Sequence, residues 1–129
     1  MKFFRNITIG SAIVAFTSFA TPSAAQHLEA NTWYFGIFAG LDFNSGSPVA
    51  LTNGQDSTGE GCFSLSDKNT GQILFYSDGI KVWNRNHTMM PNGFGLYGHP
   101  SSTQSGVVVP TPGSTTLFYV FTAGAEAGY

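Results

Sequence analysis

Short apolar or alternating runs, each ended by turn residues, follow one another along the chain from about residue 30. No window of this region has the 3.6-residue hydrophobic period of an amphipathic helix, whereas short alternating runs between turn signals are the pattern of β-strands. We therefore predict an all-β protein. The predicted strands are Thr32–Phe38, Val49–Thr52, Gly61–Ser66, Gln72–Ser77, Ile80–Asn84, Gly106–Val109 and Thr116–Thr122.

Two turns divide the middle of the chain into a meander. Asp67–Gly71 combines side chains that bond to their own backbone with a glycine that can adopt a positive φ. Asp78-Gly79 is a preferred two-residue hairpin connection. The segment Gly61–Asn84 is therefore expected to form a three-stranded antiparallel meander. Its middle strand, Gln72–Ser77, carries large apolar side chains on both faces, which is typical of a strand packed between two layers.

An aromatic tripeptide recurs along the chain. Leu74-Phe75-Tyr76 returns 43 residues later as Leu117-Phe118-Tyr119, and Trp33-Tyr34-Phe35 precedes it by 41 residues. The glycines that frame the tripeptides at 74 and 117 also correspond, at a spacing of 45: Gly61 with Gly106, and Gly79 with Gly124.

Periods of roughly 40–50 residues built from short strands are typical of β-propeller blades. We expect antiparallel meanders forming a partial β-propeller, with about one and a half blades plus an N-terminal strand. The N-terminal strand around Trp33 would complete a last blade that is absent here, and the region is expected to be truncated at its C-terminus.

The N-terminus has the parts of a secretory signal peptide. Two basic residues are followed by the apolar run Ile7–Ala20, and small residues precede Gln26, before which we place the cleavage. A transmembrane anchor needs roughly 20 strongly apolar residues, and this run is shorter and diluted by hydroxyl residues. The prediction is a signal peptide at 1–25, a partial propeller-like region at 26–129, no transmembrane anchor, and export to the extracellular space or the outer cell surface.

The charge of the chain argues against nucleic acid as a partner, and its cysteine content excludes stabilisation by an intramolecular disulfide. Beyond residue 25 the chain has three Lys and Arg against seven Asp and Glu, a formal charge of −4, so no basic patch is available for nucleic acid. Aromatic residues make up 15% of the chain and charged residues 9%, the reverse of the balance in a disordered chain. Cys62 is the only cysteine, which rules out an intramolecular disulfide. We expect a buried thiol on a strand.

A set of short motifs occurs in a fixed order: Asn31–Gly36, Ala39–Phe43, Gly61-Cys62, Asp67–Gly71, Leu74–Gly79, Val82–His87, Met90–Gly93, Gly98-His99 and Ser101–Ser105. Together they resemble the N-terminal region of large gliding-motility-associated surface proteins, which carry C-terminal sorting domains and leave the cell by type IX secretion. The resemblance covers residues 31–126. It implies a propeller-like N-terminal part, export across both membranes and a role at the cell surface, and it supplies no catalytic residue.

The sequence predicts no catalytic residue, no cofactor and no metal site. Asp67–Gly71 hints at a calcium loop, but its glycine comes one position early and no distal glutamate follows, so a β-turn is favoured. Asp56 and Glu60 are expected in a solvated loop, and Asp78 is explained by its turn. No pair of carboxylates for glycoside hydrolysis is assigned.

The connection Arg85–Ser105 is the predicted place for a binding surface. It runs for about 20 residues without a strand pattern, a length that is uncommon unless a loop is functional or disordered. The favoured alternative is an ordered crossover between blades whose polar residues bond to the backbone. Polysaccharide and other cell-envelope proteins are the candidate partners. The candidate ligand-binding residues are Asn86, His87, Asn92, Tyr97, His99 and Gln104.

Three functions stay open on the sequence. The favoured one is a non-catalytic secreted or cell-surface segment that serves as an adhesion or assembly platform of a gliding-motility-associated protein. The second is a carbohydrate-active enzyme or a glycan-binding module on a propeller. The third is a truncated reading frame without independent function.

Overall fold

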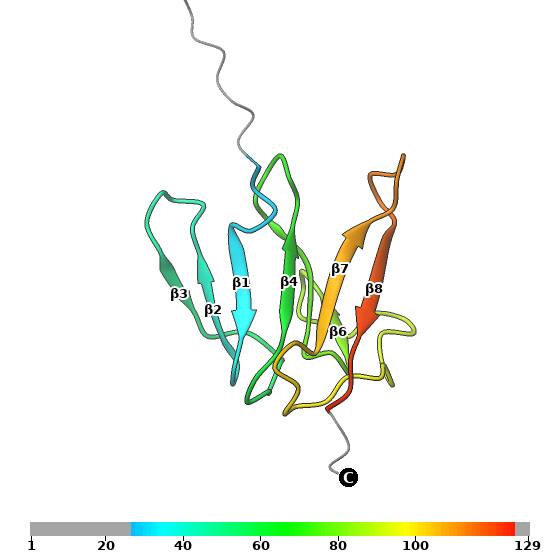
Figure 1. Ribbon diagram of the computed structural model, residues 1–129. Coiled ribbons are helices and arrows are strands. Elements are labelled where there is room, and N and C mark those ends of the chain that lie inside the picture. Colours follow the sequence, from blue (N-terminus) through cyan, green and yellow to red (C-terminus); the bar gives the residue numbers. More distant parts are fainter. Residues whose placement is uncertain (1–26, 126–129) are drawn as a thin grey trace, which may run out of the picture.

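In the computed structural model, which describes residues 27–125, the chain forms eight β-strands and no helix. The strands make three antiparallel sheets (Figure 1), which confirms the predicted all-β class. None of the described segments is a helix long and apolar enough to cross a bilayer. The strands are β1 (Thr32–Phe35), β2 (Ala39–Asp42), β3 (Val49–Leu51), β4 (Phe63–Ser66), β5 (Ile73–Ser77), β6 (Val82–Asn84), β7 (Gly106–Pro110) and β8 (Phe118–Thr122).

The predicted signal peptide, residues 1–25, lies outside the described residues, as does the end of the chain from residue 126.

The first sheet has the strand order β1-β2-β3 and corrects two expectations about the N-terminal strand. The predicted strand Thr32–Phe38 ends at Phe35, because Gly36 and Phe38 adopt positive φ values of 65° and 57° and turn the chain back. The returning segment forms β2, which the sequence analysis missed, and it pairs with β1 along its whole length. The N-terminal strand is therefore part of a local three-stranded sheet and not a lone strand.

The second sheet is the predicted three-stranded meander, in the order β4-β5-β6. Its second connection is longer than the predicted two-residue hairpin, because β5 ends at Ser77 and β6 begins at Val82. The carboxylate of Asp78 shapes this connection by accepting hydrogen bonds from the backbone N–H groups of Ile80 (2.9 Å) and Lys81 (2.7 Å). These bonds draw both residues into a turn and shorten the strand.

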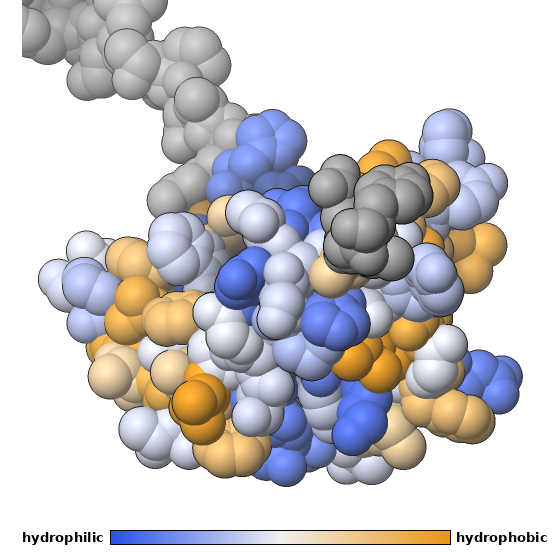
Figure 2. Space-filling view, turned by 60° about the horizontal axis from the view of Figure 1, so that its bottom comes forward, coloured by the Kyte–Doolittle hydropathy of each residue, from blue (hydrophilic) through white to orange (hydrophobic). Residues whose placement is uncertain are grey.

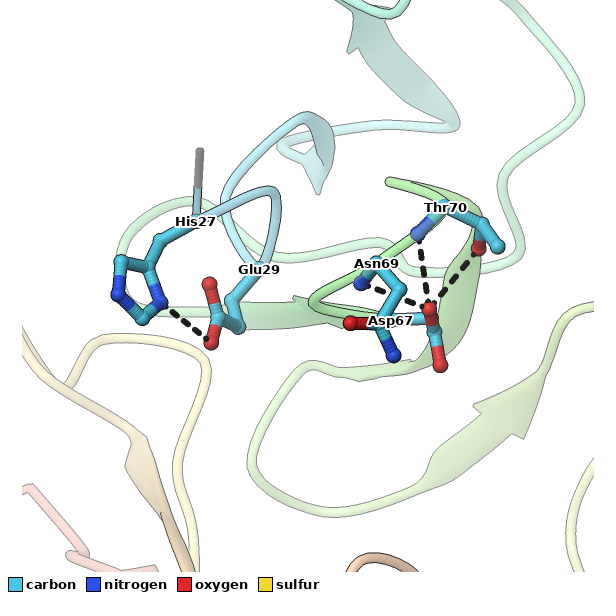
Figure 3. Close-up of polar contacts among 5 residues, drawn as sticks. All are labelled: His27, Glu29, Asp67, Asn69 and Thr70. Atoms are coloured by element: carbon cyan, nitrogen blue, oxygen red, sulfur yellow. Dashed lines mark hydrogen bonds and ion pairs between the residues drawn. The ribbon is translucent and has the colours of Figure 1, made fainter. Parts of the chain in front are cut away.

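One carboxylate holds the turn between β4 and β5 (Figure 3). Oδ1 of Asp67 accepts hydrogen bonds from the N–H groups of Asn69 and Thr70, both at 2.9 Å, and from the Thr70 hydroxyl at 3.1 Å. The bonds from the two backbone N–H groups lower the pKa of Asp67. Gly71 closes the turn with a φ of 69°. The β-turn predicted at Asp67–Gly71 is confirmed.

The middle strand β5 is packed between two layers, as its two apolar faces predicted. On one side Phe75 joins the buried residues Phe63, Leu65 and Val82, against which Phe118 of β8 packs. On the other side Tyr76 stacks on Tyr34 of β1 with ring centroids 4.3 Å apart, and on Trp83 of β6 at 5.5 Å. The second sheet is therefore sandwiched between the first sheet and the β7–β8 hairpin, and the two aromatic clusters are the core.

The recurring tripeptide corresponds to two consecutive hairpins of the same construction. The β4–β5 hairpin pairs Leu65 with Phe75, and the β7–β8 hairpin pairs Pro110 with Phe118, which lie 45 and 43 residues further along. Strands β4 and β7 run in the same direction (Figure 1). The two spacings found in the sequence are thus the differences in residue number between corresponding strands of the two hairpins, one spacing for the first strand and one for the second.

Serine hydroxyls join the first sheet to the second. The N–H groups of Thr32 and Tyr34, which point away from β2, donate to Ser66 Oγ (3.2 Å) and Ser64 Oγ (2.7 Å) on β4. Ser64 returns a bond to the carbonyl of Tyr34 at 3.2 Å. The backbone groups at this edge of β1 are therefore hydrogen-bonded to serine side chains and not to another strand.

Each end of this row of sheets is apolar. Figure 2 shows hydrophobic side chains gathered at both sides of the molecule, with polar groups between them. The exposed apolar residues include Trp33, Phe35, Ile37, Phe38 and Val49 at the first sheet, and Val107, Val109, Tyr119 and Phe121 on the outer face of the β7–β8 hairpin.

Candidate functional site

A polar cavity of about 330 Å³ lies between the first and second sheets. This volume is at the lower end of the range for small-molecule sites. Two of the six predicted binding residues, Asn86 and His87, line it, and strands of the first sheet supply the opposite wall. The lining residues are Thr32, Tyr34, Asp42, Asn44, Leu51, Asn53, Gln72, Ile73, Arg85, Asn86 and His87.

His87 fixes one wall of this cavity through both ring nitrogens. Nδ1 lies 2.9 Å from the Tyr76 hydroxyl, and Nε2 lies 2.8 Å from the amide nitrogen of Asn53. The carbonyl oxygen of Asn53 accepts the hydroxyl of Tyr34 at 3.0 Å, which leaves its NH₂ to donate to Nε2. The imidazole therefore carries its proton on Nδ1 and donates it to Tyr76.

The backbone of His87 is held with a φ of 58°, in the left-handed region. Asn84 determines this conformation, because its carbonyl accepts the His87 N–H at 2.9 Å and its side-chain oxygen accepts the N–H groups of Asn86 (2.9 Å) and Thr88 (3.1 Å). Since both ring nitrogens are occupied, His87 is a clamp between the two sheets and has no lone pair free for a metal or a substrate proton.

Two opposite charges line the cavity without pairing. Asp42 directs Oδ1 to Asn44, accepting from its backbone N–H at 2.8 Å and its amide at 2.7 Å. Arg85 has no carboxylate within ion-pair distance in the part of the chain that the structure describes. Its guanidinium and the Asn86 amide can donate to hydroxyl or carboxylate oxygens of a ligand. A single carboxylate lines the cavity, whereas glycoside hydrolysis uses two.

The other four predicted binding residues lie elsewhere. Asn92 lines a separate, mainly apolar cavity beside β8 and has a φ of 59°. Tyr97 is 84% exposed. His99 accepts the N–H of Ser101 at 3.1 Å, and the Gln104 amide donates to the carbonyl of Gly106 at 2.5 Å. The loop therefore does not gather its polar side chains into one site, and its last part bonds to backbone as the crossover alternative expects.

Asp56 contradicts its predicted place in a solvated loop. Its side chain is fully buried, and neither carboxylate oxygen has a hydrogen-bond partner among residues 27–125. Burial raises the pKa of Asp56 to about 6, and the negative charge of Asp78 adds to the rise. The loop is drawn inward because the Asp56 carbonyl accepts the Phe38 N–H (3.0 Å) and the Gln55 N–H donates to the Tyr76 hydroxyl (3.1 Å). No periodic signal in the sequence marks such a loop.

Cys62 differs in part from expectation. It precedes β4 instead of lying on a strand, and it is half-buried at the wall of an apolar cavity of about 510 Å³. Burial raises the pKa of its thiol, and the charge of Asp56 adds to this. The thiol is thus kept protonated and unreactive.

No group of three or more His, Cys, Asp or Glu in residues 27–125 is placed to hold a metal ion. Comparisons of the chain with protein-family models, with curated proteins and with solved structures found no match.

Proposed function

We propose that this chain is a non-catalytic segment of an exported cell-surface protein, in which stacked propeller-type sheets serve as a platform for assembly or adhesion. The observation that carries the proposal is the outer face of the β7–β8 hairpin, where Val107, Val109, Tyr119 and Phe121 are between 43% and 57% exposed. Soluble proteins rarely leave a contiguous apolar patch of this kind uncovered unless it binds something.

The row of sheets indicates what such a face binds. The inner face of the same hairpin is covered by the second sheet, where Phe75 and Phe118 meet edge to face with centroids 5.5 Å apart. The outer face offers aromatic side chains of the same kind, with Tyr119 and Phe121 6.3 Å apart. A further β-sheet is therefore the best occupant, and the spacing of 43 to 45 residues between hairpins favours a propeller-type arrangement of such sheets.

The export part of the proposal is tested by fractionating bacteria that secrete through a signal peptide and produce the full chain. We expect the chain outside the cytoplasm with Gln26 at its N-terminus, and we expect a chain without residues 1–25 to stay inside. Cytoplasmic retention of the uncleaved full chain would argue against it.

The assembly part is tested on the exported chain with the double variant Tyr119→Thr and Phe121→Thr. Threonine keeps the preference for a strand and removes most of the apolar surface. We expect the native chain to be retained with the cell envelope and the variant to be released into the medium. The matched control is Tyr97→Thr, an exposed aromatic outside the sheets. Equal retention of all three chains would refute a role for this face.

A second candidate function is binding of a hydroxyl-rich ligand such as a polysaccharide, and the cavity that holds Asn86, His87 and the unpaired Arg85 favours it. Calorimetric titration with soluble polysaccharides is expected to show binding that weakens at least tenfold in Arg85→Gln. The control Lys81→Gln removes a positive charge from a residue outside the cavity and should leave the affinity unchanged. Equal affinities of the two variants would exclude this cavity as the site.

A further inference from the structure

The loop between β3 and β4 forms one wall of the polar cavity and is attached at two points to the strands around it. Asn53 lines the cavity, accepts the Tyr34 hydroxyl at 3.0 Å and donates to His87 at 2.8 Å. Two residues later, the Gln55 N–H donates to the Tyr76 hydroxyl at 3.1 Å. The position of this wall therefore depends on how the loop packs against β1 and β5.

Asp56 is the buried residue of the same loop. Its side chain is fully buried, and neither carboxylate oxygen has a hydrogen-bond partner among residues 27–125. Gly54 leaves room for it, since a Cβ at that position would lie 2.9 Å from Oδ1 of Asp56 and 3.0 Å from Cδ1 of Tyr34. A carboxyl group in such a place is tolerated as the neutral acid, whereas its ionised form loses water without gaining a partner.

Four titratable groups on the surrounding elements interact with Asp56, and none of them is a cation. Asp78, directly after β5, opposes the negative charge of Asp56. Cys62 before β4, Tyr34 on β1 and Tyr76 on β5 stay neutral near pH 7, because burial raises the pKa of each, that of Tyr76 to about 12. Within residues 27–125 no Lys, Arg or His lies at ion-pair distance from Asp56. Contact with water is therefore what relieves an ionised Asp56.

The chain on the far side of Asp56 is held independently of the carboxylate. The Thr58 N–H donates to the carbonyl of Gly36 at 2.9 Å. A movement of Asp56 toward water is thus limited on this side by Thr58, and it carries residues 53–56, with the cavity wall, in the other direction.

We propose that Asp56 is a proton-controlled latch of the polar cavity: as the neutral acid it keeps the loop packed inward, and when ionised it turns toward water and draws Asn53 away from His87. The cavity wall is complete in acid and open in neutral solution. The inference rests on the second candidate function, binding of a hydroxyl-rich ligand in this cavity, and adds the regulation of that binding by pH.

The direction of the pH response follows from proton binding. The packed loop holds the Asp56 proton with a pKa of about 6, against an ordinary value of 3.8. The packed position is therefore fully favoured below the ordinary pKa and is lost as the pH rises through about 6. The difference between the two values allows the ratio of packed to released loop to change by at most about 100-fold.

His87 is the other group at this wall that can take up a proton, and it would respond with the opposite sign. Its Nε2 accepts the Asn53 amide, so a proton on that nitrogen would release Asn53 in acid. Release of the loop on raising the pH is thus assigned to Asp56, and release on lowering the pH to His87.

The test follows the exported chain, labelled with ¹³C and ¹⁵N, by NMR between about pH 4.5 and 7.5. Hydrogen exchange of each amide is divided by the rate of an unstructured peptide at the same pH, which leaves the structural protection. We expect protection of the Gln55 N–H to fall at least tenfold, with the same midpoint as the carboxyl carbon signal of Asp56, while the Thr58 N–H stays protected. Constant or rising protection at Gln55, loss at Thr58 as well, or two different midpoints would overturn the proposal.

Two variants separate the carboxylates of this loop. Asp56→Asn removes the buried charge and should make the protection of Gln55 independent of pH. The matched control Glu60→Gln removes an exposed carboxylate and should keep the native response. A native response in Asp56→Asn would refute the latch. If that variant fails to fold, the comparison of midpoints in the native chain still decides.

Calorimetric titration with soluble polysaccharides distinguishes the latch from the ligand function. We expect binding at least tenfold tighter at about pH 5 than at about pH 7.5, and no such difference in Asp56→Asn. Binding of equal affinity at both pH values would overturn control of the cavity by Asp56. An absence of binding at either pH, together with the expected response of Gln55, would reject the ligand function and support the latch.

Discussion

His87 joins two segments that are far apart in the sequence, through Tyr76 on β5 and Asn53 in the connection that precedes β4. Its conformation at a φ of 58° is held by that pair of bonds and by Asn84. The sequence predicts His87 as a ligand-binding residue, since polar loop residues often bind ligands. The structure gives it the role of a clamp in the wall of the cavity.

We expect His87→Ala to destabilise the protein by about 2–4 kcal/mol. The substitution removes two side-chain hydrogen bonds, and the alanine must still adopt the unfavourable left-handed backbone conformation without them. Urea unfolding measures the change. His27→Ala, at an exposed position, should cost less than about 0.5 kcal/mol. Equal stability of the two variants would show that the clamp is unimportant.

Asp56 makes stability fall as pH rises. Its pKa of about 6 in the folded chain lies above the ordinary value of 3.8, so the folded state holds the proton more tightly and is favoured at low pH. This stabilisation is complete below about pH 4 and is lost as the pH rises through about 6. Above pH 7 the buried charge costs at most about 3 kcal/mol.

Asp56→Asn removes this charge. We expect the variant to be more stable than the native chain at pH 7.5 and to lose the slope of unfolding free energy between about pH 4 and 6. The pKa of Asp67 is lowered and has the opposite effect, favouring folding above its ordinary pKa. A variant with the native slope between these pH values would assign the dependence to another group.

A comparison of Gly79 with Gly46 separates the conformational cost of adding a side chain at a glycine from the steric cost. The φ of Gly79 is 85°, and a Cβ placed there would lie 2.4 Å from Cβ of Ser105. Gly46 has nearly the same φ, 83°, with nothing within 4 Å. Gly46→Ala should therefore cost only the left-handed conformation, about 1–2 kcal/mol, while Gly79→Ala adds a steric clash and should cost about 3–5 kcal/mol. Thermal unfolding compares them, and equal costs would mean that the loop at Ser105 yields freely.

At the scale of the strands, the contact between β1 and β4 depends on serine side chains. Ser66 is almost fully buried, and its Oγ is the acceptor for the Thr32 N–H. Ser66→Ala leaves that buried N–H without a partner, so we expect a loss of about 1–3 kcal/mol and faster hydrogen exchange at Thr32. Ser101→Ala, which is exposed, serves as the control. Unchanged exchange at Thr32 in Ser66→Ala would show that another acceptor replaces the hydroxyl.

At the scale of the whole molecule, the row of sheets has an apolar face at each end, and within residues 27–125 no strand pairs with the outer edge of β8. We expect residues 26–129, purified alone, to self-associate as the protein concentration rises, because exposed apolar faces and strand edges pair readily. Sedimentation velocity over a range of concentrations tests this. A chain that stays monomeric at every concentration would contradict the expectation.

The sequence by itself determined the all-β class, the meander and the spacing of the repeated hairpins. Alternation, turn carboxylates such as Asp67 and positive-φ glycines act over a few residues, and their effect is therefore readable locally. Strand β2 was missed because Ala39–Asp42 is short and holds a glycine, so its pairing with β1 decides its conformation more than its own propensity does.

Only the tertiary structure decided the site. Asn53 and His87 meet, Ser64 and Ser66 satisfy the edge of β1, and Asp56 becomes buried because particular sheets pack against one another. None of these contacts follows from a local pattern, since each joins segments separated by 30 or more residues or depends on what covers a loop. The physical reason is that the pairing of adjacent strands depends on residues close together in the sequence, whereas the burial of a polar group depends on all the sheets and loops that pack against it.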